Sequence, residues 1–122
     1  MVYSELKRLA LRRLHWGDVF RLFSGRLHLA RVKGTSMEPT LLNSDWVAYD
    51  AKFDPTKLVN HIVVTNHPHT DALLIKRVLK VTESHVFLVG DHPEESTDSR
   101  SFGAVPISKV KGIVRCFYRR SI

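Results

Sequence analysis

After residue 27 the chain consists of short runs rich in apolar residues, which is the pattern of strands rather than of helices. Turn-rich stretches such as residues 42–45 and 66–71 separate these runs. The pattern predicts six strands, at residues 28–32, 45–50, 61–66, 72–81, 85–90 and 109–118. Because no helical pattern lies between them, we expect a mainly β fold, a compact and partly closed antiparallel β-sheet domain.

The amino-terminal segment has a different pattern. Four apolar residues recur there at helical spacing: Leu6, Leu9, Ala10 and Leu14. They predict a short amphipathic helix over about residues 3–14, so we divide the chain into a basic segment, residues 1–24, and a domain, residues 25–122. The helix would either lie on an anionic membrane or pack on the sheet, and the pattern leaves both open. Charges interrupt it too often for a transmembrane span or a secretory signal, although it is similar to an organellar transit peptide.

Charge and cysteine content bear on the cellular location of the protein. Residues 1–34 carry +6 of the net charge of +7, and the rest of the chain is nearly neutral. The 122 residues are expected to form one core. Cys116 is the single cysteine, so no intramolecular disulfide can form and a reducing compartment is compatible. We therefore expect a cytoplasmic protein, with peripheral membrane contact through residues 1–24 as the alternative.

Ser36 and Lys76 are the candidate reactive residues. Ser36 lies in the run Gly-Thr-Ser-Met-Glu-Pro-Thr-Leu, and Lys76 lies in the apolar run Leu-Leu-Ile-Lys-Arg-Val. A serine hydroxyl needs a base to take its proton, and a lysine can be that base only when its surroundings lower its pKa. In a strand, Lys76 shares a face with Leu74 and Val78, which would supply apolar surroundings. The alternatives are an ordinary polar turn around Ser36 and a solvated lysine on an amphipathic strand.

A third segment, residues 90–105, reads Gly-Asp-His-Pro-Glu-Glu-Ser-Thr-Asp-Ser-Arg-Ser-Phe-Gly-Ala-Val. Together with residues 34–41 and 73–78, in this order, it resembles the catalytic domain of the type I signal peptidases, which are Ser/Lys endopeptidases. The resemblance spans about residues 28–115. It implies that residues 25–122 are a Ser/Lys peptidase domain with the β core that signal peptidases share with LexA-like repressors.

The resemblance also assigns roles to residues. It implies that Ser36 is the acyl-forming nucleophile and Lys76 its general base, and that Ser96 orients the lysine. Asp98 and Arg100 match a structural ion pair beneath the site.

Further assignments follow from the first motif. Gly34 occupies the position of a serine that often helps to bind the oxyanion, so backbone N–H groups would take over that task. Met37 and Pro39 match positions that contact substrate.

The third segment has two other interpretations, a solvated acidic loop and a metal-binding loop. The metal ligands would be Asp91, His92, Glu94, Glu95 and Asp98. His67 and His69 flank Pro68 in a turn, and no spacing completes a zinc set. We expect no metal and no cofactor.

Three functions are compatible with this resemblance. We expect an endopeptidase that removes a leader from a partner protein, because short members without a membrane anchor resemble the maturation proteases of nickel superoxide dismutase. A membrane-associated signal peptidase is the second. The third, a self-cleaving repressor, is disfavoured because 33 residues before Gly34 are too few for a DNA-binding domain. No Ala-Gly or Cys-Gly bond precedes the nucleophile either, so we expect no nucleic-acid partner.

Overall fold

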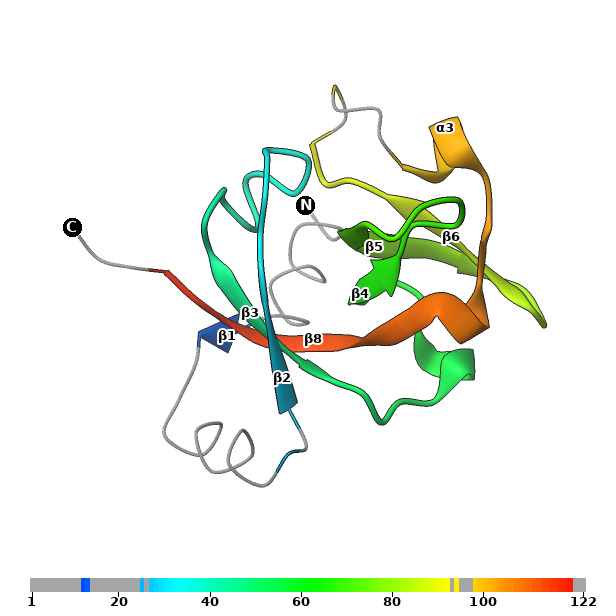
Figure 1. Ribbon diagram of the computed structural model, residues 1–122, viewed down its shortest axis with the longest axis horizontal. Helices are drawn as coiled ribbons and strands as arrows, with labels where there is room; N and C mark the ends of the chain where they lie inside the picture. Colours follow the sequence, from blue (N-terminus) through cyan, green and yellow to red (C-terminus); the bar gives the residue numbers. More distant parts are fainter. Residues whose placement is uncertain (1–11, 14–24, 26, 93, 95–97, 120–122) are drawn as a thin grey trace.

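The structure of the protein is a computed structural model that describes residues 12–13, 25, 27–92, 94 and 98–119 (Figure 1). Its strands are β1 (Arg12–Arg13), β2 (Leu27–Arg31), β3 (Trp46–Asp50), β4 (Ile62–Asn66), β5 (Leu73–Val81), β6 (His85–Val89), β7 (Val105–Pro106) and β8 (Val110–Tyr118). The helical elements are α3 (Ser99–Phe102) and two 3-10 turns, Pro55–Lys57 and Ile107–Lys109.

The strands form one curled sheet in the order β2-β3-β8-β4-β5-β6-β7. Every neighbouring pair along this path is antiparallel. The six predicted strands agree with β2 to β6 and β8 to within about one residue at each end. The structure therefore confirms the prediction of a compact, partly closed antiparallel β domain.

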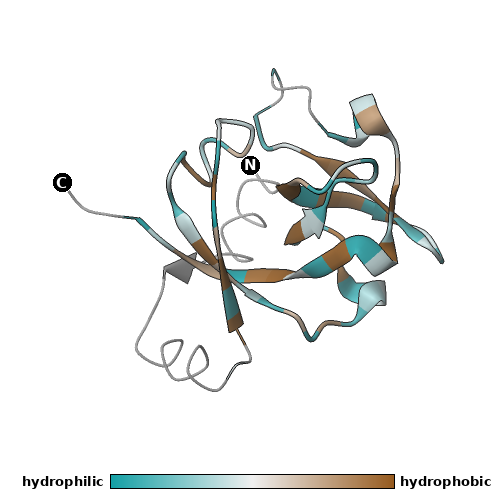
Figure 2. Ribbon diagram, viewed as in Figure 1, coloured by the Kyte–Doolittle hydropathy of each residue, from teal (hydrophilic) through white to brown (hydrophobic). Residues whose placement is uncertain are grey.

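Two apolar clusters hold the curled sheet together. The first core consists of Ala30, Val32, Met37, Leu41, Val47, Ile62, Val64 and Val114. The second core consists of Leu58, Val63, Val78, Val86, Leu88, Val105, Val110 and Ile113. Strand β4 supplies alternate residues to both cores, which explains why its first four residues are all buried. Figure 2 shows hydrophobic and hydrophilic positions interspersed along the strands.

The amino-terminal prediction is corrected where the structure describes it. Arg12 and Arg13 form strand β1, which pairs in parallel with Cys116 and Phe117 of β8, so the expected helix does not extend over these two residues. Strand β4 pairs with β8 only as far as Ile113. Beyond that residue, β1 pairs with the same edge of β8. Backbone pairing along an otherwise open edge thus outweighs the helical pattern here. The rest of the predicted helix lies outside the described residues.

Membrane-spanning helices were also sought in the described part of the chain. None of its helices has the length and apolar character that a membrane crossing requires.

Candidate active site

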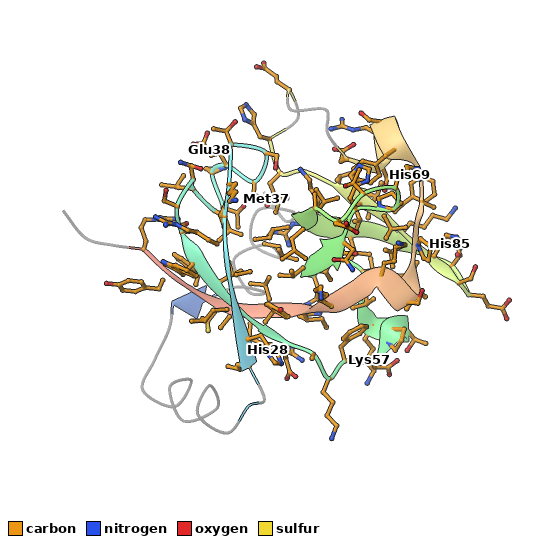
Figure 3. The ribbon with its side chains drawn as sticks, in the orientation of Figure 1. His28, Met37, Glu38, Lys57, His69 and His85 are labelled. Carbon is orange, nitrogen blue, oxygen red and sulfur yellow. The ribbon has the colours of Figure 1, made fainter. Side chains whose placement is uncertain are left out.

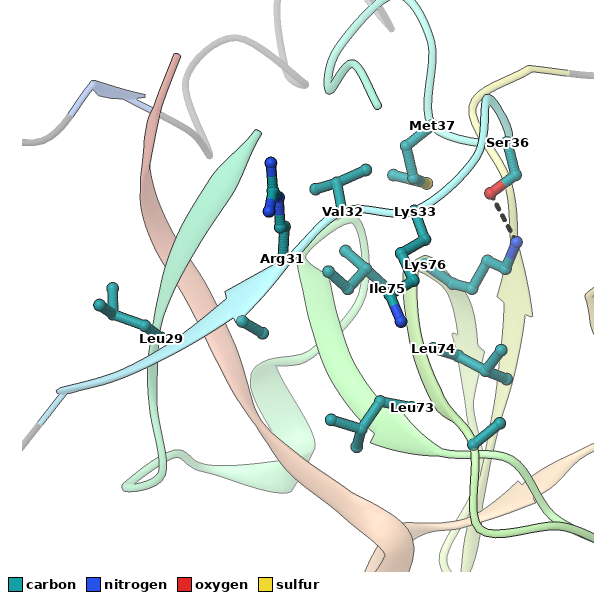
Figure 4. Close-up of a pocket in the computed structure, with 12 residues that line it drawn as sticks. Leu29, Arg31, Val32, Lys33, Ser36, Met37, Leu73, Leu74, Ile75 and Lys76 are labelled. Carbon is teal, nitrogen blue, oxygen red and sulfur yellow. Dashed lines mark hydrogen bonds between the residues drawn. The ribbon is translucent and has the colours of Figure 1, made fainter. Parts of the chain in front are cut away.

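The fold brings Ser36 and Lys76 into direct contact. Ser36 lies in the loop that follows β2, and Lys76 lies on β5, a central strand of the sheet. The Nζ atom of Lys76 donates a hydrogen bond of 2.7 Å to Oγ of Ser36 (Figure 4). Lys76 is only 5% exposed. The arrangement therefore places an amine at hydrogen-bonding distance from a hydroxyl, in surroundings that contain little water.

The loop that carries Ser36 is anchored on both sides of the serine. Gly34 has a φ of +85°, a region that favours glycine, and its N–H donates to Oδ1 of Asn43 at 2.8 Å. Beyond the serine, Met37 and Leu41 bury their side chains in the first core. The N–H of Leu41 also donates to the carbonyl of Met37 at 3.0 Å. The serine is thus held between a glycine turn and two buried anchors.

The segment after β6 packs against the backbone of the serine loop. A Cβ atom on Gly90 would lie 2.6 Å from the carbonyl oxygen of Ser36, so only glycine fits there without a shift. The N–H of His92 donates to that same carbonyl at 2.9 Å. Nδ1 of His92 donates a hydrogen bond of 3.2 Å to the carbonyl oxygen of Thr35. Residues 90–92 therefore fix the backbone on both sides of the Ser36 nitrogen.

A buried ion pair links the second and third segments. Nε and Nη2 of Arg77 donate to Oδ1 and Oδ2 of Asp91, each at 2.9 Å. The two side chains are 1% and 0% exposed. Arg77 also donates to the carbonyl of Asn60, and Oγ1 of Thr40 donates to Oδ2 of Asp91 at 2.6 Å. One network thus joins the serine loop, β5 and the segment that follows β6.

The sequence analysis did not single out Arg77 and Asp91 as a pair. A signal was present, because an arginine inside an apolar strand requires an acidic partner when it is buried. Several acidic residues are available in the chain, however, and alternation along β5 does not identify which of them lies opposite Arg77.

Asp98 and Arg100 form the other ion pair of the third segment, with 2.7 Å between Arg100 Nη2 and Asp98 Oδ2. Asp98 is fully buried and caps α3, whereas the Arg100 side chain is 52% exposed. Burial alone would raise the pKa of Asp98. Hydrogen bonds from the Arg100 side chain and from the N–H groups of Gly90 and Arg100 outweigh it, so the pKa lies below its usual value. The buried carboxylate therefore organises the backbone around itself.

The remaining predicted site residues fall in different places. Met37 lines the cleft beside Ser36, whereas Pro39 is exposed, follows a cis peptide bond and is not part of the cleft lining. Ser96 lies outside the described residues, so its predicted contact with Lys76 stays a prediction.

Three of the candidate metal ligands, Asp91, His92 and Asp98, have hydrogen-bond partners elsewhere in the protein. Asp91 and Asp98 bind arginines. The ring centres of His67 and His69 lie 5.8 Å apart, and the His67 ring also packs on Phe102. Figure 3 labels His69. Within the part of the chain that the structure describes, no three His, Cys, Asp or Glu residues are grouped as metal ligands would be.

A cleft of about 470 Å³ opens beside the serine and the lysine (Figure 4). Strand β2 and the serine loop form one wall, and the start of β5 forms the other. The lining residues are Leu29, Ala30, Arg31, Val32, Lys33, Ser36, Met37, Ala72, Leu73, Leu74, Ile75 and Lys76. The cleft is therefore mostly apolar, and Ser36 and Lys76 are part of its lining.

Part of the chain is similar to known proteins. Residues 79–119 match the model of the family described as signal peptidase, peptidase S26. The mitochondrial inner membrane protease subunit 1 of Xenopus tropicalis is 49% identical to this chain over 39 residues, which is 32% of this chain and 23% of the relative. The family match covers β6, the whole third segment and β8, and it leaves Ser36 and Lys76 outside the matched range.

The two ion pairs should differ in their contribution to stability. Asp91→Ala leaves Arg77 charged and buried, so we expect a loss of about 3–5 kcal/mol in the free energy of unfolding. Asp98→Ala leaves Arg100 exposed to water and removes mainly a cap and backbone hydrogen bonds, so a loss of about 1–3 kcal/mol is expected. Urea unfolding measures both, with the exposed Asp71→Ala as the control. Equal losses for Asp91→Ala and Asp98→Ala would contradict this ranking.

Proposed function

We propose that this protein is a serine endopeptidase that uses Ser36 and Lys76 as a dyad to remove a leader or propeptide from a partner protein. The observation that carries the proposal is the 2.7 Å hydrogen bond between Lys76 Nζ and Ser36 Oγ, with the lysine 5% exposed and in the lining of a cleft of about 470 Å³. The similarity of residues 79–119 to the signal peptidase family supports the same reaction class.

The proposed reaction begins with a neutral Lys76. Its amine accepts the proton of the Ser36 hydroxyl while Oγ attacks the carbonyl carbon of the scissile bond. The lysine then transfers this proton to the leaving amine, the peptide bond breaks, and the leader remains as an ester on Ser36. A water molecule then gives a proton to Lys76 and attacks the ester carbon. The bond between this carbon and Oγ breaks, Lys76 returns the proton to Oγ, and the leader leaves as a carboxylic acid that ionises in water.

The negative oxygen formed during the attack needs hydrogen-bond donors. The N–H of Gly34 is engaged by Asn43. The N–H of Ser36 has no acceptor among the described residues, and the contacts of Gly90 and His92 hold the adjoining carbonyl. We assign the Ser36 N–H as one oxyanion donor. Such a preorganised donor lowers the free energy of the transition state by about 2.7–4 kcal/mol.

The cleft wall also favours a peptide substrate. Among the described strands, β2 pairs with β3 alone, so its other edge faces the cleft with unpaired backbone groups. An extended peptide can add to such an edge as a further strand, which would lay its backbone alongside Ser36.

Two classes of partner remain as proposals. The short signal-peptidase motifs resemble those of nickel superoxide dismutase maturation proteases, which makes a propeptide-bearing precursor of that enzyme our first candidate substrate. The similarity to a subunit of a mitochondrial inner membrane protease favours a precursor held at a membrane as the second. The pairing of Arg12–Arg13 with β8 supports the first, because part of the basic segment then contacts the protein's own sheet. A cytoplasmic location fits this choice.

Ser36→Ala should abolish cleavage and leave the fold intact, because it removes the attacking oxygen and only a small volume. Turnover of a precursor is measured by mass spectrometry, and folding by the melting temperature. Ser101→Ala, an exposed serine in α3, is the matched control and should retain activity. More than a few per cent of residual activity in Ser36→Ala would exclude this serine as the nucleophile.

Lys76→Arg should be inactive although it keeps the positive charge, because a guanidinium does not lose its proton and cannot act as the base. In the wild type, activity should rise with pH as the lysine loses its proton. Lys80→Arg, at an exposed position of the same strand, serves as the control. A flat pH profile, or an active Lys76→Arg variant, would show that the lysine is not the base.

The two partner classes predict different responses to lipid. If the basic segment contacts the sheet, anionic vesicles should not change the rate at which a soluble nickel superoxide dismutase precursor is cut. If the segment binds membranes, the protein should co-sediment with the vesicles, and high salt or replacement of Lys7 and Arg8 by glutamine should weaken that binding. We expect the first result. Salt-sensitive sedimentation together with faster cleavage on vesicles would favour the membrane candidate.

A further inference from the structure

The charges that line the cleft have a single sign. Three of its lining residues are basic, Arg31, Lys33 and Lys76, and none carries a carboxylate. Most of the other lining residues are apolar. A concave surface with charges of one sign and apolar walls attracts the opposite charge more strongly than an open surface does.

The three basic residues differ in what they contact. Lys76 donates to Ser36. Arg31 places its guanidinium 5.5 Å from the ring centre of Trp46, and Figure 4 shows it directed away from Ser36. Lys33 is exposed, and its side chain points into the cleft toward Ile75 and Leu74 (Figure 4).

Among the described residues, the ammonium group of Lys33 has no hydrogen-bond or ion-pair partner. Water solvates this ammonium while the cleft is open. A bound peptide would displace part of that water, and the free energy of the complex would then depend on the peptide group that replaces it.

We propose that Lys33 is a specificity residue, which selects a peptide with an acidic side chain in the cleft. The inference rests on the proposed endopeptidase function and adds a substrate class to it. An acidic side chain compensates the desolvated ammonium, an amide does so less well, and a basic side chain is repelled. Lys33 precedes Ser36 by three residues and points along the cleft, so the acidic residue lies within about four residues of the scissile bond.

Peptide scanning tests the proposal. Ten-residue fluorogenic peptides built from alanine, serine and leucine carry one Glu, Gln or Lys, moved through every position. For the wild type, we expect kcat/KM to be about five- to tenfold higher for Glu than for Gln at one position, with the difference shrinking as salt rises. Lys33→Met should remove this difference, and Lys33→Glu should reverse it in favour of the Lys peptide.

Lys52→Glu is the matched control, because Lys52 is an exposed lysine outside the cleft lining and its substitution changes the net charge equally. It should keep the preference of the wild type. Melting temperatures check that all variants are folded. The proposal is overturned if Lys33→Met keeps the same Glu to Gln ratio as the wild type, or if Lys52→Glu loses the ratio to the same extent as Lys33→Glu.

Binding measurements separate this inference from the proposed function. The labelled Glu and Gln peptides are titrated into Ser36→Ala, with and without Lys33→Met, and followed by fluorescence anisotropy. If no peptide is cut but the Glu peptide binds more tightly in a Lys33-dependent way, the inference stands and the protease function falls. If peptides are cut without any Lys33-dependent preference, the function stands and the inference falls. Neither cleavage nor Lys33-dependent binding would overturn both.

Discussion

The buried pair of Arg77 and Asp91 is the interaction on which the site depends. A guanidinium stays charged at any pH that a protein survives, so burying Arg77 requires a carboxylate that is held in place. Asp91 supplies it with two hydrogen bonds and also accepts one from Thr40 of the serine loop. Arg77 directly follows Lys76, and Asp91 lies between the two residues that contact the Ser36 carbonyl. The pair therefore fixes both members of the candidate dyad through their chain neighbours.

Much of the sheet could be predicted because a run of apolar residues between turn residues is a local property. Strands β2 to β6 and β8 are runs of five to nine residues, long enough for the flanking turns to define their ends. β7 and α3 contain two and four residues, too few to generate a period. Arg12 and Arg13 form a strand instead of the predicted helix because β4 leaves part of the β8 edge unpaired. That edge is distant in the sequence, so the residues around Arg12 do not indicate it.

Only part of the candidate site could be predicted, because only part of it depends on residues that are close in the sequence. Ser36 and Lys76 stand out through the motifs around them, and the structure brings them to hydrogen-bonding distance. The identity of ion-pair partners is a tertiary property, because it depends on which strands become neighbours. Arg77 and Asp91 were missed as a pair on that account. Asp98 and Arg100 were found because they lie two residues apart, although the sequence did not indicate that only the aspartate is buried.

The curl of the sheet explains how two adjacent basic residues can both be buried. Successive side chains of a strand point to opposite faces, so Lys76 and Arg77 would not both be shielded in a flat sheet with one solvated face. In this fold both faces of β5 are covered in the middle of the strand, from Lys76 to Val78. Ile75 packs against the first core, and Val78 belongs to the second. The same curvature brings the open edge of β2 to face the start of β5 across the cleft. Closure of the sheet thus determines both the shielding of the lysine and the shape of the groove in which a peptide would meet it.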